Sequence, residues 1–194
     1  MKDFSPILEQ ARPGDLVMVR HGSEGIQANS SFGAAGIEWF SDGQVSHCFV
    51  CLGDGAIVEA MPAGGVQINP IKKYCKDEYS LALRRLTPPF MGMYRNTGER
   101  VAAAGKTFVG SRYDFAQIGV DMVYCTLGKM GWTKLQREVA RHWKGWKNGF
   151  TCSELCCAAV WKGIGVDLLP SKDFSLATPQ DLLVISNLVT ICVV

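Results

Sequence analysis

The stretch "NGFTCSELCCAAVWKGIG", Asn148 to Gly165, contains three of the chain's eight cysteines within six residues. Thr151 and Glu154 stand three residues apart, directly before an apolar helical face, and this is the pattern of a capping box. The pattern predicts a helix with Thr151 at its N-cap and Cys152 as its first residue. Two hypotheses follow: Cys152 is a nucleophile, or all three cysteines are small apolar residues of a buried helix.

The first position of a helix favours a reactive thiol. Unpaired backbone N–H groups and the positive end of the helix dipole stabilise an anion there. A cysteine at this position tends to have a lowered pKa and more thiolate, which is the nucleophilic form. Cys156 and Cys157 lie one turn further along, so we expect them to pack in the core.

A thiolate nucleophile needs a basic partner that a third group orients. The chain has three histidines. His142 falls on a basic amphipathic stretch and is predicted to be solvated, whereas His21 follows the first predicted strand, residues 16–19, and stays a candidate. His47 begins an otherwise apolar strand, where a polar ring needs a partner. It is therefore the preferred base for Cys152.

Two apolar runs joined by Gly53-Asp54-Gly55 predict a β-hairpin that begins at His47. A three-residue loop pairs Phe49 with Glu59, and Glu59 then lies diagonally from His47 on the same face. A two-residue loop puts Glu59 on the opposite face. Glu59 is itself a charge inside an apolar strand, so the two polar residues are predicted to be partners.

Composition indicates an ordinary globular protein. The chain has 194 residues, 47% of them apolar and 20% charged, and a net charge of +2 that gives no reason to expect nucleic-acid binding. It shows no signal-peptide core and no membrane-spanning apolar run. We expect a cytoplasmic protein with reduced thiols, while phage delivery or another export route stays open.

Cys48 and Cys51 form a C-x-x-C in an apolar run that is predicted to be a strand. Residues three apart on a strand point to opposite faces, so the two thiols could not share one metal ion. No second C-x-x-C follows at zinc-ribbon spacing. The sequence therefore predicts neither a metal nor any other cofactor, and a redox protein built on this pair is a distant alternative.

The remaining pattern predicts one α+β domain over residues 1–194, with a helical insertion at about 120–147. Further strands are expected at 65–68, at 81–86 and in the C-terminal tail, and a short helix at 34–40. A helix is expected from Thr97, as its N-cap, to Gly110. Leu135, Val139, Trp143 and Trp146 recur at helical spacing after Trp132. The stretch before Trp132 is left unassigned.

Four blocks in this order carry a resemblance to a known family: "RPGDLV" at 12–17, "SHCFVCLGDGAIVEA" at 46–60, "YDF" at 113–115 and "FTCSELCCAAV" at 150–160. The chain resembles the circularly permuted branch of the NlpC/P60 cysteine peptidases, the YiiX/YaeF-like papain-like amidases. Lecithin:retinol acyltransferase is a more distant relative. In this branch the cysteine helix follows the histidine hairpin.

The resemblance implies a permuted papain-like fold, in which an antiparallel sheet or barrel packs against helices and the nucleophile lies at a helix N-terminus. Cys152 would be the nucleophile, His47 the base and later the general acid, and Glu59 the group that orients the imidazole. Tyr113 matches a tyrosine that lines the site and stabilises the oxyanion, with a buried structural tyrosine as the alternative. Asp15 is predicted to be a turn residue.

The implied reaction is hydrolysis of an amide through a thioester at Cys152. The expected substrate is a small peptide of the peptidoglycan type, another cell-wall component or an N-acyl compound. Two alternatives remain: a lipid acyltransferase or thioesterase with the same triad, and a non-catalytic binding or assembly module of the same fold. The sequence favours no oligomeric state.

Two features depart from the family pattern. Cys48 stands where a small apolar residue usually follows the histidine, and we expect it to be buried filler, although a thiol there could also sensitise the site to oxidation. Residues 129–147 carry six Lys/Arg against one acid, Glu138, with three tryptophans. This segment either contacts an anionic surface or, as we favour, packs through its tryptophans with a solvated basic face.

Overall fold

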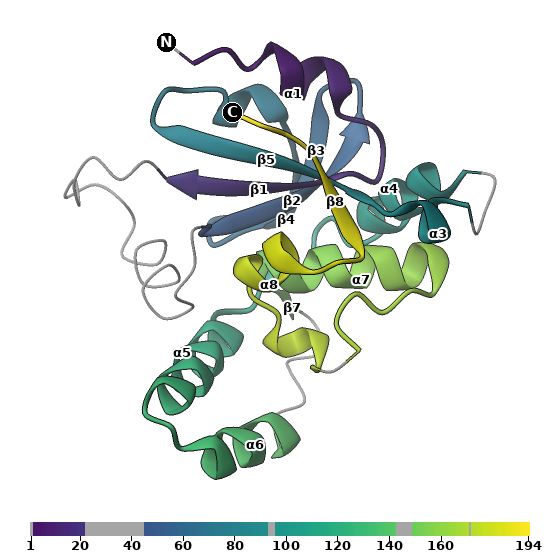
Figure 1. Cartoon of the computed structure of the whole chain (residues 1–194). Coiled ribbons are helices and arrows are strands. Elements are labelled where there is room, and N and C mark those ends of the chain that lie inside the picture. The colour runs from purple at the N-terminus through teal and green to yellow at the C-terminus, as the bar shows by residue number, and fades with distance from the viewer. Residues whose placement is uncertain (1, 22–44, 93–95, 143–148, 171) are drawn as a thin grey trace.

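The computed structural model describes residues 2–21, 45–92, 96–142, 149–170 and 172–194. Six strands form an antiparallel sheet in the order β4-β3-β2-β1-β5-β8 (Figure 1). They are β1 (Leu16–His21), β2 (His47–Gly53), β3 (Ala56–Met61), β4 (Gly65–Pro70), β5 (Tyr79–Leu86) and β8 (Leu188–Val193). A two-stranded parallel sheet joins β6 (Arg112–Tyr113) to β7 (Gly149–Phe150).

The α-helices are α1 (Ser5–Gln10), α3 (Pro88–Met91), α4 (Thr97–Lys106), α5 (Phe115–Lys129), α6 (Thr133–His142), α7 (Cys152–Ile164) and α8 (Pro179–Val184). Two 3-10 helices cover Ile71–Tyr74 and Phe174–Leu176. The strands expected near 65, near 81 and in the tail are all confirmed. The short helix expected at 34–40 lies outside the described residues.

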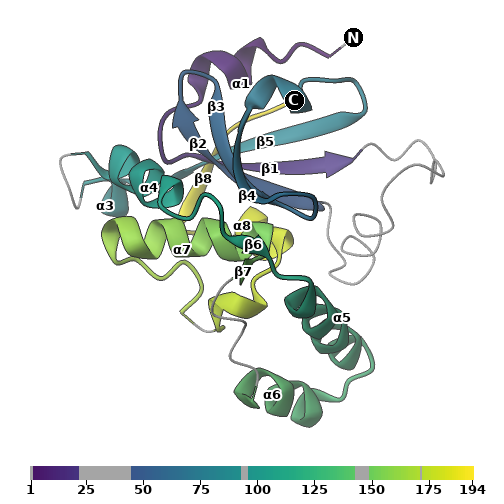
Figure 2. The same ribbon diagram turned by 180° about the vertical axis from the view of Figure 1, so that it is seen from behind.

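The large sheet is packed on both faces, which explains why its inner strands are apolar throughout. On one face Met18 and Val50 pack against Leu155 of α7. On the other face Phe49 packs with Ile7 of α1. Figure 2 shows α4 beside α7 below the sheet, with α1 above it. Helices against a mostly antiparallel sheet confirm the predicted α+β class.

Helix α7 is a buried core helix with a defined start and end. The Glu154 N–H donates to Thr151 Oγ1 and the Thr151 N–H to Glu154 Oε2, both at 3.3 Å, so the predicted capping box is confirmed. The helix ends before Gly165, which has a φ of 70°. A Cβ on Gly163 would lie 2.8 Å from the Cα of Val101, so this glycine permits the close approach of α4.

The turn of the β2–β3 hairpin differs from both predicted forms. Its tip is a two-residue turn, Asp54-Gly55, with both residues at positive φ. A bulge between Cys51 and Gly53 adds a residue and restores the pairing of Val50 with Val58. Carried one residue further along each strand, this register sets Phe49 opposite Glu59, as the three-residue loop would have done.

The predicted bounds of α4 were wrong at both ends. Asn96 is the N-cap residue, and Thr97 is already helical. At the other end the Thr107 N–H donates to the carbonyl of Ala104, three residues back. This tighter bonding ends the regular helix at Lys106, four residues before the expected stop at Gly110.

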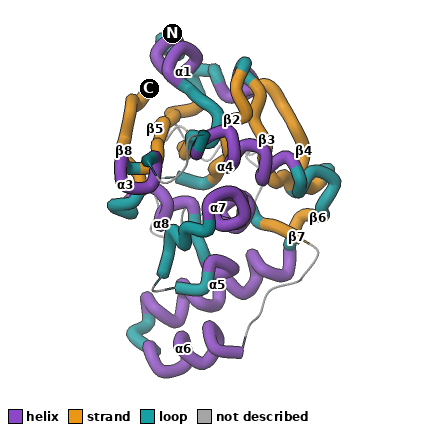
Figure 3. The backbone as a smooth tube through the Cα atoms, turned by 90° about the vertical axis from the view of Figure 1, so that its right-hand side faces the viewer, coloured by secondary structure: helices purple, strands orange, loops and turns teal. Residues whose placement is uncertain are grey.

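Helices α5 and α6 form a helical hairpin, residues 115–142, that overlaps the predicted insertion. Gly131, with a φ of 72°, reverses the chain between them, and Gln136 Nε2 donates to the carbonyl of Tyr124 at 3.2 Å. Figure 3 shows α7 between the sheet and this hairpin, with α6 furthest from the sheet. None of the helices in the described ranges is long and apolar enough to span a membrane.

Candidate active site

His47 and Glu59 meet across the β2–β3 hairpin. The distance from His47 Nε2 to Glu59 Oε2 is 2.8 Å. An ionised carboxylate can only accept, so Nε2 carries the hydrogen and Nδ1 is left to exchange a proton with another group. The ring of His47 also lies 5.7 Å, centroid to centroid, from that of Tyr74. The bulge in β2 is what puts these two side chains on one face.

Glu59 is a fully buried carboxylate with four side-chain partners. Oε1 accepts from Asn69 Nδ2 and Lys73 Nζ, each at 2.8 Å. Oε2 accepts from His47 and from the hydroxyl of Tyr74. Burial alone would raise the pKa of Glu59, but these donors, His47 foremost, lower it to about 2. The carboxylate is therefore charged, satisfied and held in one orientation.

Cys152 occupies the first position of α7 and is 2% exposed. Its thiol lies beside the side chains of His47 and Cys48. A hydrogen bond from Cys48 lowers the pKa of Cys152, burial opposes it, and the hydrogen bond and charge of His47 lower it further, so that the pKa falls well below its usual value. This shift favours the thiolate form.

The pKa of the His47 imidazole shifts in the opposite direction. Burial acts to lower the pKa of His47, but hydrogen bonds with Cys152 and Glu59, and the charges of both, raise it to about 9. Both shifts act toward a Cys152 thiolate beside a His47 imidazolium. This ion pair is what nucleophilic attack by a thiol requires.

The neighbouring thiols of Cys48 and Cys51 lie on opposite faces of the large sheet. Cys48 packs with α7 in one core cluster, and its Sγ lies 3.7 Å from that of Cys156. Cys51 lies in the cluster on the opposite face of the sheet, so the predicted separation of the C-x-x-C pair is confirmed. Burial raises the pKa of Cys157 well above its usual value, in contrast to Cys152.

Tyr113 at the end of β6 lines a pocket together with Cys152. Burial raises the pKa of Tyr113, so its hydroxyl stays protonated and able to donate a hydrogen bond. Asp15 lies elsewhere: it accepts from the Arg12 N–H at 2.8 Å and pairs with Arg85 at 2.7 Å. It is a structural turn residue, as predicted.

The other two histidines take different positions. His21 ends β1, and its ring packs edge-on against Tyr79 at 5.1 Å. His142 is the last residue of α6. Within the described ranges, no group of three or more His, Cys, Asp or Glu side chains is arranged to hold a metal ion.

The pocket beside Cys152 opens between α5, the start of α7 and the segment before α8. Its lining is largely apolar, with Ile118, Met122, Cys125, Ala177 and Pro179 around one acid, Asp121. Burial raises the pKa of Asp121 to about 7, opposed by a 2.8 Å hydrogen bond from Gln117. This wall of the site comes from the stretch that the sequence left unassigned.

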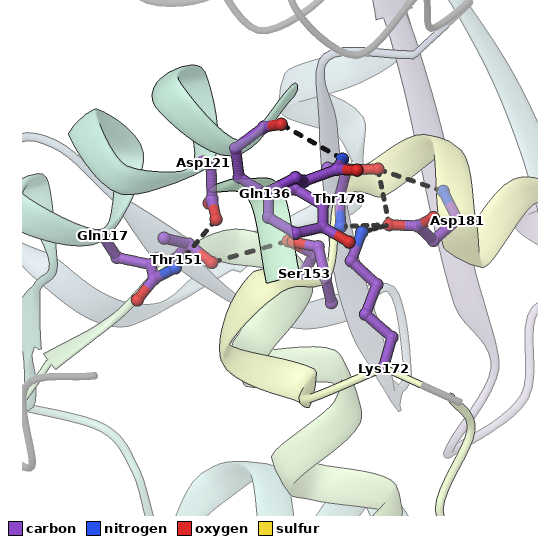
Figure 4. Close-up of polar contacts among 10 residues, drawn as sticks. Gln117, Asp121, Gln136, Thr151, Ser153, Lys172, Thr178 and Asp181 are labelled. Carbon is purple, nitrogen blue, oxygen red and sulfur yellow. Dashed lines mark hydrogen bonds and ion pairs between the residues drawn. The ribbon is translucent and has the colours of Figure 1, made fainter. Parts of the chain in front are cut away.

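Polar contacts tie the pocket walls together (Figure 4). The hydroxyl oxygens of Thr151 and Ser153 lie 3.5 Å apart at the start of α7. Ser153 Oγ also donates to the carbonyl of Ala177 at 2.6 Å. Lys172 pairs with Asp181 of α8 at 2.8 Å. The bond from Ser153 fixes the segment before α8 against the N-terminus of α7, where Cys152 lies, and the Lys172 pair ties the same segment to α8.

Sequence reasoning missed the residues that hold Glu59. Asn69, Lys73 and Tyr74 come from β4 and the 3-10 helix after it, in "INPIKKY". Glu59 pairs with Gln67 in the β3–β4 register, which places β4 next to it. Two lysines and a tyrosine directly after a strand beside a buried acid were the available signal, but only the three-dimensional turn shows which side chains reach it.

This site has the parts of a papain-like cysteine hydrolase, with the histidine hairpin before the cysteine helix in the chain. The model of a known family, described as "Permuted papain-like amidase enzyme, YaeF/YiiX, C92 family", matches residues 10–130. Since the match covers more than half of the chain, the protein belongs to this family. No curated protein matches the sequence.

The family match spans His47, Glu59 and Tyr113 and ends before Cys152. Family membership supports amide hydrolysis by a cysteine peptidase or amidase in general. The particular residues that would perform it are argued from the geometry above.

Proposed function

We propose that this protein hydrolyses an amide bond through a thioester at Cys152, with His47 as acid and base and Glu59 orienting the imidazole. The observation that carries the proposal is the buried chain of contacts from Glu59 through His47 to the thiol at the start of α7. The pKa shifts of Cys152, His47 and Glu59 favour the protonation states that these roles require.

In the first step the Cys152 thiolate attacks the substrate carbonyl carbon and a tetrahedral oxyanion forms. The backbone N–H of Cys152, at the helix N-terminus, and the hydroxyl of Tyr113, which lines the same pocket, would donate hydrogen bonds to that oxyanion. The His47 imidazolium then gives its proton to the leaving nitrogen. The C–N bond breaks, an amine departs, and a thioester remains on Cys152.

In the second step neutral His47 takes a proton from water, and the hydroxide attacks the thioester carbonyl. Collapse of this intermediate releases a carboxylic acid and restores the thiolate beside the imidazolium. Glu59 stays ionised throughout, because its pKa of about 2 is far below the working range. Its part is to hold the ring and stabilise its positive charge.

The lining of the pocket indicates that the acyl part of the substrate carries an apolar group. A small peptide of the peptidoglycan type or an N-acyl compound would place an apolar group among Ile118, Met122 and Pro179. The same lining favours a second candidate, a thioesterase or acyltransferase that accepts a lipid acyl group. Both share the thioester at Cys152 and differ in the bond that is cleaved.

A matched substrate panel separates them. The same acyl group, short or long, is offered as an anilide, an ester and a thioester, and release of each leaving group is followed along with acyl–Cys152 by mass spectrometry. The proposal expects amide cleavage that is lost in Cys152→Ala. Turnover of esters and thioesters alone would favour lipid acyl chemistry, and no acyl-enzyme with any member would favour a non-catalytic binding module.

A further inference from the structure

Large apolar and basic side chains are both exposed at the turn of the helical hairpin and along α6. We call Met130, Trp132, Lys134, Leu135 and Arg137 the tip patch. Trp132 is 55% exposed, Met130 53% and Leu135 48%, and both Lys134 and Arg137 are exposed. The favoured hypothesis that tryptophans pack this segment therefore fails for Trp132. Trp143 and Trp146 lie outside the described residues.

The packing of α6 explains why Leu135 is exposed. Gln136 donates to the carbonyl of Tyr124, and its side chain lies so close to Gly128 that a Cβ there would come within 2.7 Å of Nε2. This contact turns one side of α6 toward α5. Leu135, the residue before Gln136, points about 100° away from that side, and Trp132 lies just before the first residue of α6. Figures 1 and 3 both place α6 at the end of the molecule away from the sheet.

The charges of the segment give the patch a preferred partner. Between Lys129 and Lys147 there are six basic residues and one acid, Glu138. An anionic polymer would be matched by the charges and by stacking on Trp132, but it would not use the exposed aliphatic side chains of Leu135 and Met130. A membrane interface uses both, since apolar rings enter the headgroup boundary while Lys and Arg pair with lipid phosphates.

We propose that the tip patch binds an anionic phospholipid surface, with Trp132 and Leu135 inserted and Lys134 and Arg137 against the phosphates. The binding is peripheral. Helix α5 also forms a wall of the Cys152 pocket through Ile118 and Met122, so membrane contact and pocket share one pair of helices. The surface does not depend on the catalytic assignment.

The test is co-sedimentation of the full chain with vesicles of phosphatidylcholine, with and without phosphatidylglycerol, at low and high salt. Two variants alter the patch: Trp132→Ser with Leu135→Ser, and Lys134→Glu with Arg137→Glu. Their matched controls are Trp161→Ser, at a tryptophan 56% exposed on α7, and Lys76→Glu with Lys106→Glu, at two exposed lysines. Circular dichroism verifies that each variant folds.

Binding to anionic vesicles that falls about tenfold or more in both patch variants, and stays unchanged in both controls and in Cys152→Ala, supports the proposal. Absence of wild-type binding to phosphatidylglycerol would overturn it. Equal binding to neutral vesicles, or equal loss in the controls, would do the same. Binding to soluble polyphosphate that ignores Trp132 and Leu135, without vesicle binding, would assign the patch to a polymer instead.

Discussion

The two sides of the candidate site are built differently. On the hairpin side, Glu59 is fully buried and each of its carboxylate oxygens has two partners. On the α5 side, the acid that lines the pocket, Asp121, accepts a hydrogen bond from Gln117, and Phe115 and Val123 of the same helix are more than half exposed. The first side is organised around a charge, and the second around an apolar space.

This difference indicates which half can vary. A carboxylate with four donors and an imidazole fixed by it have one workable arrangement, because removal of any partner leaves a buried charge short of a bond. Substitutions that change the volume of an apolar wall with one acid should cost little stability. We therefore infer that chemistry is set by the β2–β3 hairpin and substrate choice by α5.

The largest effect should come from the imidazole. His47→Ala removes the base and the proton donor, so kcat/KM for the best amide should fall about a thousandfold. His21→Ala is the matched control, because His21 ends β1 and contacts Tyr79 rather than the thiol. Steady-state kinetics on both variants give the comparison. Equal losses of kcat/KM in the two variants would contradict the assignment of His47 as the base.

Matched amide substitutions on the two sides should have opposite effects on stability. Glu59→Gln keeps the shape but loses the charge that His47 and Lys73 require, and should lower the free energy of unfolding by about 3 kcal/mol. Asp121→Asn removes a poorly matched charge and should raise stability at pH 8. Denaturant melts measure both. Destabilisation of similar size in the two variants would contradict the distinction.

The same two acids predict opposite pH dependences. The pKa of Glu59 falls from 4.5 to about 2 on folding, so its stabilising contribution is present above pH 4.5 and is lost as the pH falls through 2. The pKa of Asp121 rises from 3.8 to about 7, so its contribution is present below pH 3.8 and is lost as the pH rises through 7.

Unfolding free energies across pH 2 to 9 check these directions. Glu59→Gln should flatten the acid limb of the wild-type profile, and Asp121→Asn should flatten the decline toward neutral pH. A wild-type acid limb that persists unchanged in Glu59→Gln would show that other carboxylates account for it.

The smallest effect concerns the thiol next to the histidine. Because a hydrogen bond from Cys48 lowers the pKa of Cys152, Cys48→Ala should raise that pKa while amide turnover persists. Cys51→Ala removes a thiol from the opposite face of the sheet and should leave the pKa of Cys152 unchanged. Thiolate absorbance at 240 nm against pH compares the two. If both variants leave the titration of Cys152 where it was, Cys48 is only buried filler.

Local patterns allowed much of this site to be predicted. The capping box located the start of α7 because its two residues act within one turn, and apolar context marked His47 and Glu59 as residues in need of partners. The hairpin tip was less predictable. Asp54-Gly55 favours a two-residue turn, and nothing local in "VCLGDG" reveals the bulge that restores the register of Glu59.

Non-local features could not be predicted. The donors Asn69, Lys73 and Tyr74 reach Glu59 only through the turn after β4. The wall formed by α5 was missed because its apolar residues face a pocket on one side and solvent on another, which blurs the helical periodicity.

The ion pair between Cys152 and His47 is the central claim, and thiol labelling tests it most directly. The rate of iodoacetamide labelling at each cysteine is measured by mass spectrometry from pH 4 to 9, in wild type, His47→Ala and Glu59→Ala. We expect Cys152 to label far faster than Cys156 already in the acid half of this range, and its labelling to move to alkaline pH in His47→Ala. Labelling of Cys152 no faster than that of Cys156, and unaffected by loss of His47, would contradict the account.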